Sequence, residues 1–321
     1  MNRQTISSHS STVSTSTDFA EASNHDKAGK SYWDQTYRPE YAPRAVDPHN
    51  TSLKNFVERQ FHRYFLKTLR SMEGKELLEV GCGGSRYLPY FSKEFGLRVS
   101  GLDYSERGCA SASRILTKEG VSGEIVCANF FEPPEFLFER FDVVVSFGVV
   151  EHFDDTTNCL AAIARFVKQG GLVLTFIPNM VGLVGHLQRV ADRRVFYKHV
   201  LLDKVILREA HEQAGLFVQE CEYFMFNNFF VINMNEIARH SAEWYLKAPL
   251  IRGLKYVSGA IWAVETLFHP FRPNRFMAPF IACAARVIEP KASVSQGWDL
   301  RDDLRYGSNP DAGELGSGKE K

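Results

Sequence analysis

The sequence has no excess of either charge. Lysine and arginine together number 38, aspartate and glutamate also number 38, and the formal net charge at pH 7 is zero. A chain without a global positive field has no general attraction for the phosphates of nucleic acid. We therefore expect no nucleic-acid partner.

Closely spaced cysteines are also missing. The six cysteines lie singly along the chain, so no spacing indicates a disulfide framework or a zinc site. No grouping of histidine, aspartate or glutamate has the spacing of a metal site such as HExxH, and we predict no metal. Unpaired thiols are typical of a cytoplasmic protein.

Long apolar runs are absent as well. No uninterrupted apolar stretch approaches the roughly 18 to 20 residues that cross a bilayer. The start of the chain also lacks the apolar core of a secretory signal and the acid-poor composition of a transit peptide. Residues 1–29 are rich in serine and threonine, and residues 293–321 are polar and glycine-rich. We predict that both segments are disordered tails.

What the sequence does contain is a series of short apolar runs that alternate with helical patterns. This alternation is typical of an α/β fold with a parallel sheet. Five nearly continuous runs predict buried strands, and two further strands follow them. The predicted strands are 75–80, 97–103, 123–129, 141–147, 171–177, 215–224 and 280–288.

Helical patterns fill the intervals. Residues 105–118 form a predicted helix with Ser105 as N-cap, and residues 158–168 form another that Gly170 and Gly171 would end. A third helix is predicted over 203–213, and residues 30–72 read as a helical lead-in. Residues 225–279 are rich in aromatic and aliphatic side chains interrupted by charges, which predicts an insertion of amphipathic helices within a domain spanning 73–292.

A glycine-rich turn, Gly81-Cys82-Gly83-Gly84, directly follows the first predicted strand. Ligands bind at this end of the strands in open α/β sheets, and glycine lets a ligand lie against the backbone. A tight turn without a ligand remains an alternative. In a dinucleotide fingerprint the third glycine would stand where this chain has Arg86, which counts against NAD or FAD.

Two polar residues follow later strands. Asp103 ends the second strand about twenty residues after the glycines, where a carboxylate can accept hydrogen bonds from both ribose hydroxyls. Asn129 ends the third strand, and its amide could contact an adenine edge while Phe130 packs on the ring. Taken alone, Asp103 could be an ordinary helix cap and Asn129 could cap a turn.

Five segments together resemble the successive motifs of class I S-adenosylmethionine (SAM)-dependent methyltransferases of the small-molecule, UbiE/UbiG type. They are LLEVGCGGS, VSGLDYSE, ANFFEPP, FDVVVSFGVVEHFDD and VKQGGLVLTFIPN, and they cover roughly residues 73–180. The resemblance implies a Rossmann-like, mainly parallel seven-stranded sheet with helices on both faces, in which the last strand is antiparallel beside the fifth. It also implies SAM as cofactor.

The resemblance assigns residues to that cofactor by motif position. Glu79, Gly81 and Gly83 would surround the methionine part, Asp103 the ribose, and Asn129 with Phe130 the adenine. Ser85 replaces a frequent third glycine, and Asn129 lacks the charge of the common aspartate. The residues expected to bind the cofactor are Glu79, Gly81, Cys82, Gly83, Asp103, Tyr104, Asn129, Phe130, Ser146 and Phe147. Residues 31–37 resemble an aromatic lead-in that closes over the cofactor, with a surface staple as the alternative.

The expected reaction is methyl transfer to a small apolar acceptor, with oxygen favoured. A hydroxyl acceptor must lose a proton, and His152 is the candidate base because it follows the fourth strand on the cofactor side. His186 and His199 are weaker candidates. Two alternatives stay open: methylation of a protein or RNA, and a SAM-binding scaffold without catalysis. Residues 244–271 are a candidate peripheral membrane contact or a substrate cap.

Overall fold

The computed structural model describes residues 26–38 and 40–288. The predicted tail 293–321 lies outside the described residues, as does most of the tail 1–29. The predicted boundary at residue 29 falls too late, because Asp26 already forms a β-bridge with Phe153.

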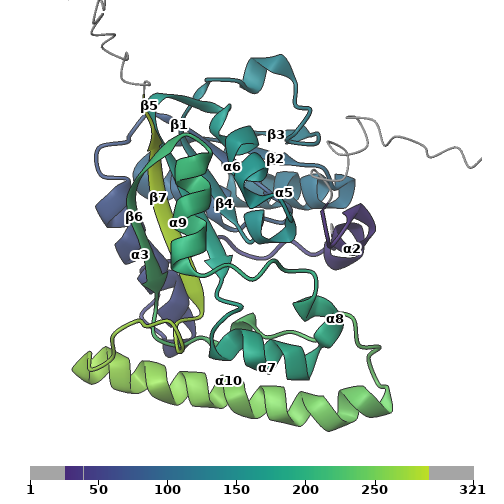
Figure 1. Cartoon of the computed structure of the whole chain (residues 1–321). Helices are drawn as coiled ribbons and strands as arrows, with labels where there is room; N and C mark the ends of the chain where they lie inside the picture. Colours follow the sequence, from purple (N-terminus) through teal and green to yellow (C-terminus); the bar gives the residue numbers. More distant parts are fainter. Residues whose placement is uncertain (1–25, 39, 289–321) are drawn as a thin grey trace, which may run out of the picture. The chain divides into compact units, whose positions relative to one another are not determined.

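A seven-stranded sheet in the order β3-β2-β1-β4-β5-β7-β6 forms the centre of the fold (Figure 1). Strand β7 runs antiparallel to both β5 and β6, and the β3-β2-β1-β4-β5 pairings are parallel, as predicted. The strands are β1 Glu76–Val80, β2 Arg98–Asp103, β3 Gly123–Cys127, β4 Phe141–Phe147, β5 Val167–Pro178, β6 Leu216–Phe224 and β7 Phe280–Val287.

Helices cover both faces of this sheet. The side chains of neighbouring strand residues alternate between two cores: Leu78 and Val144 pack in one, and Leu77 and Val143 in the other. The first core includes helices α6 Thr156–Ala164 and α9 Lys204–Gln213, and the second includes α3 Phe56–Thr68, α4 Tyr87–Phe95 and α5 Glu106–Glu119. The remaining elements are α2 Lys30–Thr36, η1 Leu53–Asn55, η2 Glu135–Leu137, η3 Val150–His152, α7 Leu183–Ala191, α8 Arg193–Phe196, η4 Phe229–Val231 and α10 Ala242–Phe268.

The helix predicted over 158–168 is wrong at its end. Helix α6 stops at Ala164, and Val167 already pairs with Phe141 as the first residue of β5. Gly170 and Gly171 therefore lie within a strand. Gly170 has a φ of 76°, and the register shifts in this stretch, so the glycines permit an irregularity in the strand rather than a helix end.

The insertion predicted as several helices contains one long helix, α10, of 27 residues. Strand β6 ends and strand β7 begins at the edge of the sheet where β5 also ends, so α10 lies beyond the carboxyl ends of the parallel strands (Figure 1). One side of α10 is fixed by Ser258, whose Oγ accepts a hydrogen bond from the Phe229 amide, and by Trp262, which stacks on Phe56. Within the described residues, no helix is both long and apolar enough to span a membrane.

Candidate functional site

The glycine turn begins where β1 ends. Gly81 has a φ of 75°, which favours glycine, and a Cβ there would lie 2.5 Å from Val149 Cγ2. A Cβ on Gly83 would lie 2.5 Å from Tyr37 Cε2. Both positions therefore require glycine, because neighbouring side chains already occupy the space above the turn.

Asp103 fixes this turn to the end of β2. Its Oδ2 accepts a hydrogen bond from the Gly83 amide at 2.8 Å, and its Oδ1 accepts one from the Ser105 amide at 2.7 Å. The carboxylate is buried, and this burial raises its pKa. Asp103 lines a small cavity beside the turn. Each carboxylate oxygen keeps a second lone pair for a ligand hydroxyl.

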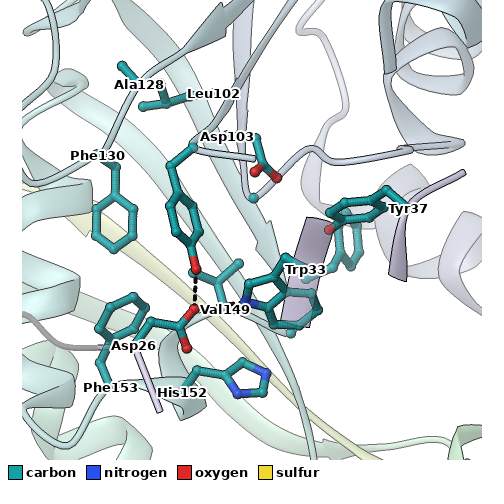
Figure 2. A pocket seen from close by; sticks show the side chains of 14 residues that line it. Asp26, Trp33, Tyr37, Leu102, Asp103, Ala128, Phe130, Val149, His152 and Phe153 are labelled. Atoms are coloured by element: carbon teal, nitrogen blue, oxygen red, sulfur yellow. Dashed lines mark hydrogen bonds between the residues drawn. The ribbon is translucent and has the colours of Figure 1, made fainter. Parts of the chain in front are cut away.

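The cavity lies between the sheet edge and the first described residues of the chain (Figure 2). These residues, 26–37, include the predicted aromatic segment 31–37 and together form the lead-in. Asp26 accepts hydrogen bonds from Trp33 Nε1 at 2.7 Å and from the Tyr104 hydroxyl. The Lys27 amide donates to the His152 carbonyl at 2.9 Å. Trp33 and Tyr37 line the cavity, so the predicted aromatic lead-in does cover it, whereas Asp26 was placed in a tail by the sequence prediction.

The rest of the wall is largely apolar. Phe130 and Phe153 form an edge-on pair with ring centroids 5.4 Å apart, and Leu102, Ala128 and Val149 add to the same lining. Such a surface suits a flat, weakly polar ring. Phe130 was predicted. Phe153 and Val149 were missed, although Phe153 directly follows the predicted His152 and Val149 precedes it by three residues.

Not all predicted cofactor residues reach the cavity. Of the predicted site residues, those that line it are Gly81, Asp103, Tyr104, Phe130, Phe147 and His152. The predicted residues Cys82, Gly83, Asn129 and Ser146 are not among the lining residues. The Cys82 side chain points into the core against Gly101, and the Asn129 side chain accepts a hydrogen bond from the Phe131 amide, as expected of a turn cap.

Glu79 also lies below the cavity surface. Its Oε2 accepts a hydrogen bond from Ser85 Oγ at 2.6 Å, and burial raises its pKa to about 8. Ser85 Oγ in turn accepts from the Tyr87 and Leu88 amides at the start of α4. Ser85 stands where the family frequently has a third glycine, and its hydroxyl links Glu79 of β1 to the first amides of α4.

His152 forms part of the cavity floor. Its Nδ1 is 2.8 Å from the Lys198 carbonyl, so Nδ1 carries the proton and Nε2 keeps a lone pair. Trp33 packs edge-on against the imidazole at 5.2 Å, and burial lowers the pKa of His152. His199 lies beside it, with ring centroids 4.7 Å apart. His186 is exposed on α7 and is not among the lining residues.

The cavity has a volume of about 90 Å³. Small-molecule sites in proteins usually enclose about 300 Å³ or more. A nucleoside-sized ligand therefore requires the lead-in to move away from the sheet edge. Tyr37 and Trp33 are the side chains that would have to shift, since they cover the glycine turn and His152.

A larger groove of about 830 Å³ opens beside α10 and the start of α4. Most of its surface is apolar and includes Val57, Phe230, Tyr256 and Trp262. Tyr87, which also lines this groove, stacks on Phe147 with ring centroids 4.6 Å apart. Phe147 lines the small cavity, so one layer of stacked rings separates the groove from the cavity.

Comparison with known proteins gives a consistent result. A family model described as a methyltransferase domain matches residues 78–175. A ubiquinone biosynthesis O-methyltransferase from Bradyrhizobium sp. (strain ORS 278) is 31% identical over 171 residues, which cover 53% of this chain and 65% of that protein. A protein of the same description from Rhodopseudomonas palustris (strain BisA53) is 30% identical over 187 residues, which cover 56% of this chain and 68% of the relative.

The fold is similar to that of geranyl diphosphate C-methyltransferase from Streptomyces coelicolor A3(2). The TM-score is 0.52 at 14% sequence identity, with 81% of this chain and 96% of the other covered. At this identity the similarity concerns the fold alone. This chain spans slightly less than two thirds of the length of the first relative, and the match covers about half of this chain.

Proposed function

This chain belongs to the class I SAM-dependent methyltransferases, and from this premise we propose that it transfers the SAM methyl group to a hydroxyl oxygen of a small apolar acceptor. The observation that carries the proposal is the cavity between Asp103 and His152. It joins a carboxylate suited to ribose hydroxyls with a neutral imidazole beyond the end of β4. The relatives described as O-methyltransferases support oxygen as the acceptor atom.

In this proposal SAM supplies the methyl group on a sulfonium. Asp103 and the Gly81–Gly83 backbone bind the cofactor, and Phe130 and Phe153 pack beside its adenine. The lead-in closes over the cofactor and excludes water, so that the acceptor oxygen is held in line with the methyl group. His152 assists loss of the acceptor's proton.

The groove beside α10 supports an apolar acceptor. It is open, largely apolar and separated from the cavity by Tyr87 stacked on Phe147. A ring-shaped acceptor could lie in the groove with its reacting hydroxyl toward Tyr87, the ring that stacks on Phe147 of the cavity. Among the described residues that line the cavity there is no lysine or arginine, and the chain has no net charge, so a protein or RNA substrate has no comparable support.

The test measures binding and turnover separately. Calorimetric titration with SAM and with NAD should show SAM binding alone, and incubation with a mixture of phenolic acceptors should yield S-adenosylhomocysteine. His152→Ala should lower turnover much more than SAM affinity, whereas the exposed His186→Ala should change neither. SAM binding without turnover for any acceptor would favour a non-catalytic scaffold.

We also propose that α10 contacts a membrane surface from which an apolar acceptor is drawn. Its outer side carries exposed apolar side chains, including Leu246 at 79% and Leu267 at 72% exposure. Arg252 is exposed on the same helix, whereas Lys247 pairs with Glu243 and donates to the Ala191 carbonyl, and Lys255 packs over the Phe230 ring. An amphipathic helix with interspersed basic residues can rest in the headgroup region of a bilayer.

Sedimentation with anionic phospholipid vesicles tests this contact. The double variant Leu246→Asp, Leu250→Asp should lose vesicle binding, and the double variant Val205→Asp, Ile206→Asp, which adds the same two charges at exposed sites on α9, should keep it. If the α10 variant instead changes only the oligomeric state, α10 is a subunit interface and the membrane proposal is wrong.

A further inference from the structure

Three side chains with metal-ligating groups converge beside the cavity floor. Glu151 and His152 belong to η3, and His199 follows α8, yet one ligand atom of each lies within 4.8 Å of the others. His152 Nε2 is 3.9 Å from Glu151 Oε1. The prediction of no metal considered short spacings in the sequence, and His199 enters this cluster through the fold.

Glu151 is the unusual member of this cluster. Its side chain is 1% exposed. Neither carboxylate oxygen has a hydrogen-bond partner among the described residues. A buried carboxylate without partners is costly unless it is neutral, paired or bound to a metal. The oxygens of Glu151 are therefore available to a cation.

The two histidines are oriented in a way that suits a metal. His152 Nδ1 lies 2.8 Å from the Lys198 carbonyl, and His199 Nδ1 lies 2.9 Å from the Val195 carbonyl. Metal-binding histidines commonly donate one ring N–H to a backbone carbonyl, which fixes the tautomer and directs the other nitrogen at the ion. In each ring the Nε2 atom therefore carries the lone pair that a metal ion needs.

We propose that Glu151, His152 and His199 bind a divalent transition-metal cation, such as Zn²⁺, Co²⁺, Fe²⁺ or Mn²⁺, at the floor of the cavity. A carboxylate with two imidazoles is a ligand set used by these ions, with coordination positions left open for substrate. Metal–ligand bonds of about 2.1 Å place ligand atoms roughly 3.4 Å apart, so the three side chains move closer together when the ion binds. His152 lines the cavity, so a cation bound to it would lie next to the cavity.

The cation gives the cluster a role in catalysis that rests on the proposed O-methylation. The acceptor's hydroxyl oxygen binds the cation, its O–H bond breaks, and the proton leaves to water. The oxygen then uses a lone pair to form the bond to the methyl carbon. The C–S bond breaks, and its electron pair stays on sulfur to give S-adenosylhomocysteine. His152 thus assists proton loss through the cation, which lowers the pKa of a bound hydroxyl.

Titration with Co²⁺ tests the site directly. The probe is Co²⁺ alone, added to the full chain after dialysis against a chelator, with binding followed by calorimetry and by visible absorption. All proteins carry Cys127→Ser, because Cys127 is an exposed thiol that could bind metal by itself. One equivalent should bind with a nitrogen and oxygen spectrum that lacks thiolate charge-transfer bands.

Matched variants identify the ligands. Glu151→Gln and His199→Gln should each weaken Co²⁺ binding at least about tenfold, since removing even a supporting residue costs 10- to 100-fold. His186→Gln, an exposed histidine, should leave it unchanged. Glu151→Gln keeps the shape of the buried side chain, so it tests the site even if a histidine variant fails to fold. Absent Co²⁺ binding, or equal affinity in Glu151→Gln, overturns the site.

A turnover measurement separates this proposal from the proposed function. Removing metal should reduce S-adenosylhomocysteine formation at least about tenfold, Zn²⁺ or Co²⁺ should restore it, and SAM affinity should not change. Equal turnover with and without metal overturns the catalytic role of the cation. If metal and SAM both bind but no acceptor is methylated, the proposed function fails while the metal site stands.

Discussion

At the scale of single residues, Asp103 both accepts hydrogen bonds from two backbone amides and lines the cavity. Its two oxygens accept from the Gly83 and Ser105 amides, so replacing it by alanine would leave two buried donors without partners. Asp103→Asn is the better test because it removes the charge, keeps the shape and leaves one oxygen to accept, so only one of the two amides loses its partner. A charged hydrogen bond contributes about 1.5–3 kcal/mol, so SAM affinity should fall about tenfold or more, as measured by calorimetry.

A matched control exists at the other end of the sheet. Asp142 accepts from the Glu76 amide at 3.0 Å and pairs with Lys168. It lies where β4 begins, whereas Asp103 lies where β2 ends. Asp142→Asn should lower stability without changing SAM affinity. Equal loss of affinity in both variants would mean that Asp103 acts through the fold and does not contact the ribose.

Gly83 and Tyr37 should be energetically coupled. A methyl group on Gly83 would overlap the Tyr37 ring, and overpacking of this kind costs about 1–3 kcal/mol. Gly83→Ala should therefore lower the free energy of unfolding in the wild type and have little effect in a Tyr37→Ala background. Urea unfolding of the four proteins measures the coupling. Gly253→Ala, on α10 with open space around it, should show no coupling to Tyr37→Ala.

At the scale of elements, the strands could be predicted because most of them are continuous apolar runs. Leu77, Leu78, Val143 and Val144 are fully buried, and this burial on both sheet faces leaves a clear pattern in the sequence. The start of β5 could not be predicted. Its pairing with Phe141 is a long-range contact, and a glycine pair after an apolar periodic segment normally marks the end of a helix.

The residues of the site also fall into a group that could be predicted from the sequence and a group that could not. Gly81 and Asp103 could be predicted because their spacing follows from adjacent parallel strands. Glu151 and His199 could not be recognised as a cluster, since the turn after α8 brings His199 to η3 through contacts such as Val200 N to the Glu151 carbonyl. Asp26 carries no local signal, because its partner Tyr104 lies in a different motif.

The lead-in should control the rate at which SAM enters. Opening it breaks the hydrogen bond that Asp26 accepts from the Tyr104 hydroxyl, whereas the bond that Asp26 accepts from Trp33 lies within the lead-in. Asp26→Asn weakens the bond to Tyr104 and should raise the association rate constant for SAM in stopped-flow fluorescence. Asp154→Asn removes only the exposed ion pair with Lys27, which contributes little, and should leave the rate unchanged. An unaltered rate in Asp26→Asn would show that entry does not depend on this opening.

At the scale of the whole molecule, a buried histidine makes stability depend on pH. His211 is fully buried on α9, where its Nε2 lies 3.0 Å from Thr175 Oγ1 and its Nδ1 lies 2.7 Å from the Leu207 carbonyl. Burial lowers its pKa from 6.5 to about 4. The unfolded chain therefore binds more protons than the folded chain between these two values, and stability is lost as the pH falls through this window.

Replacing this imidazole should remove part of that dependence. With a folded pKa near 4, His211 should account for about 2 kcal/mol of the stability lost between pH 7.5 and pH 5. Urea unfolding at both pH values should show a loss smaller by this amount in His211→Gln than in the wild type, while the exposed His186→Gln keeps the wild-type loss. Other buried histidines, such as His199, are present in all three proteins, so their contributions to the loss of stability cancel in the comparison. If His211→Gln loses as much stability between the two pH values as the wild type, the pKa of His211 is not lowered in the folded chain.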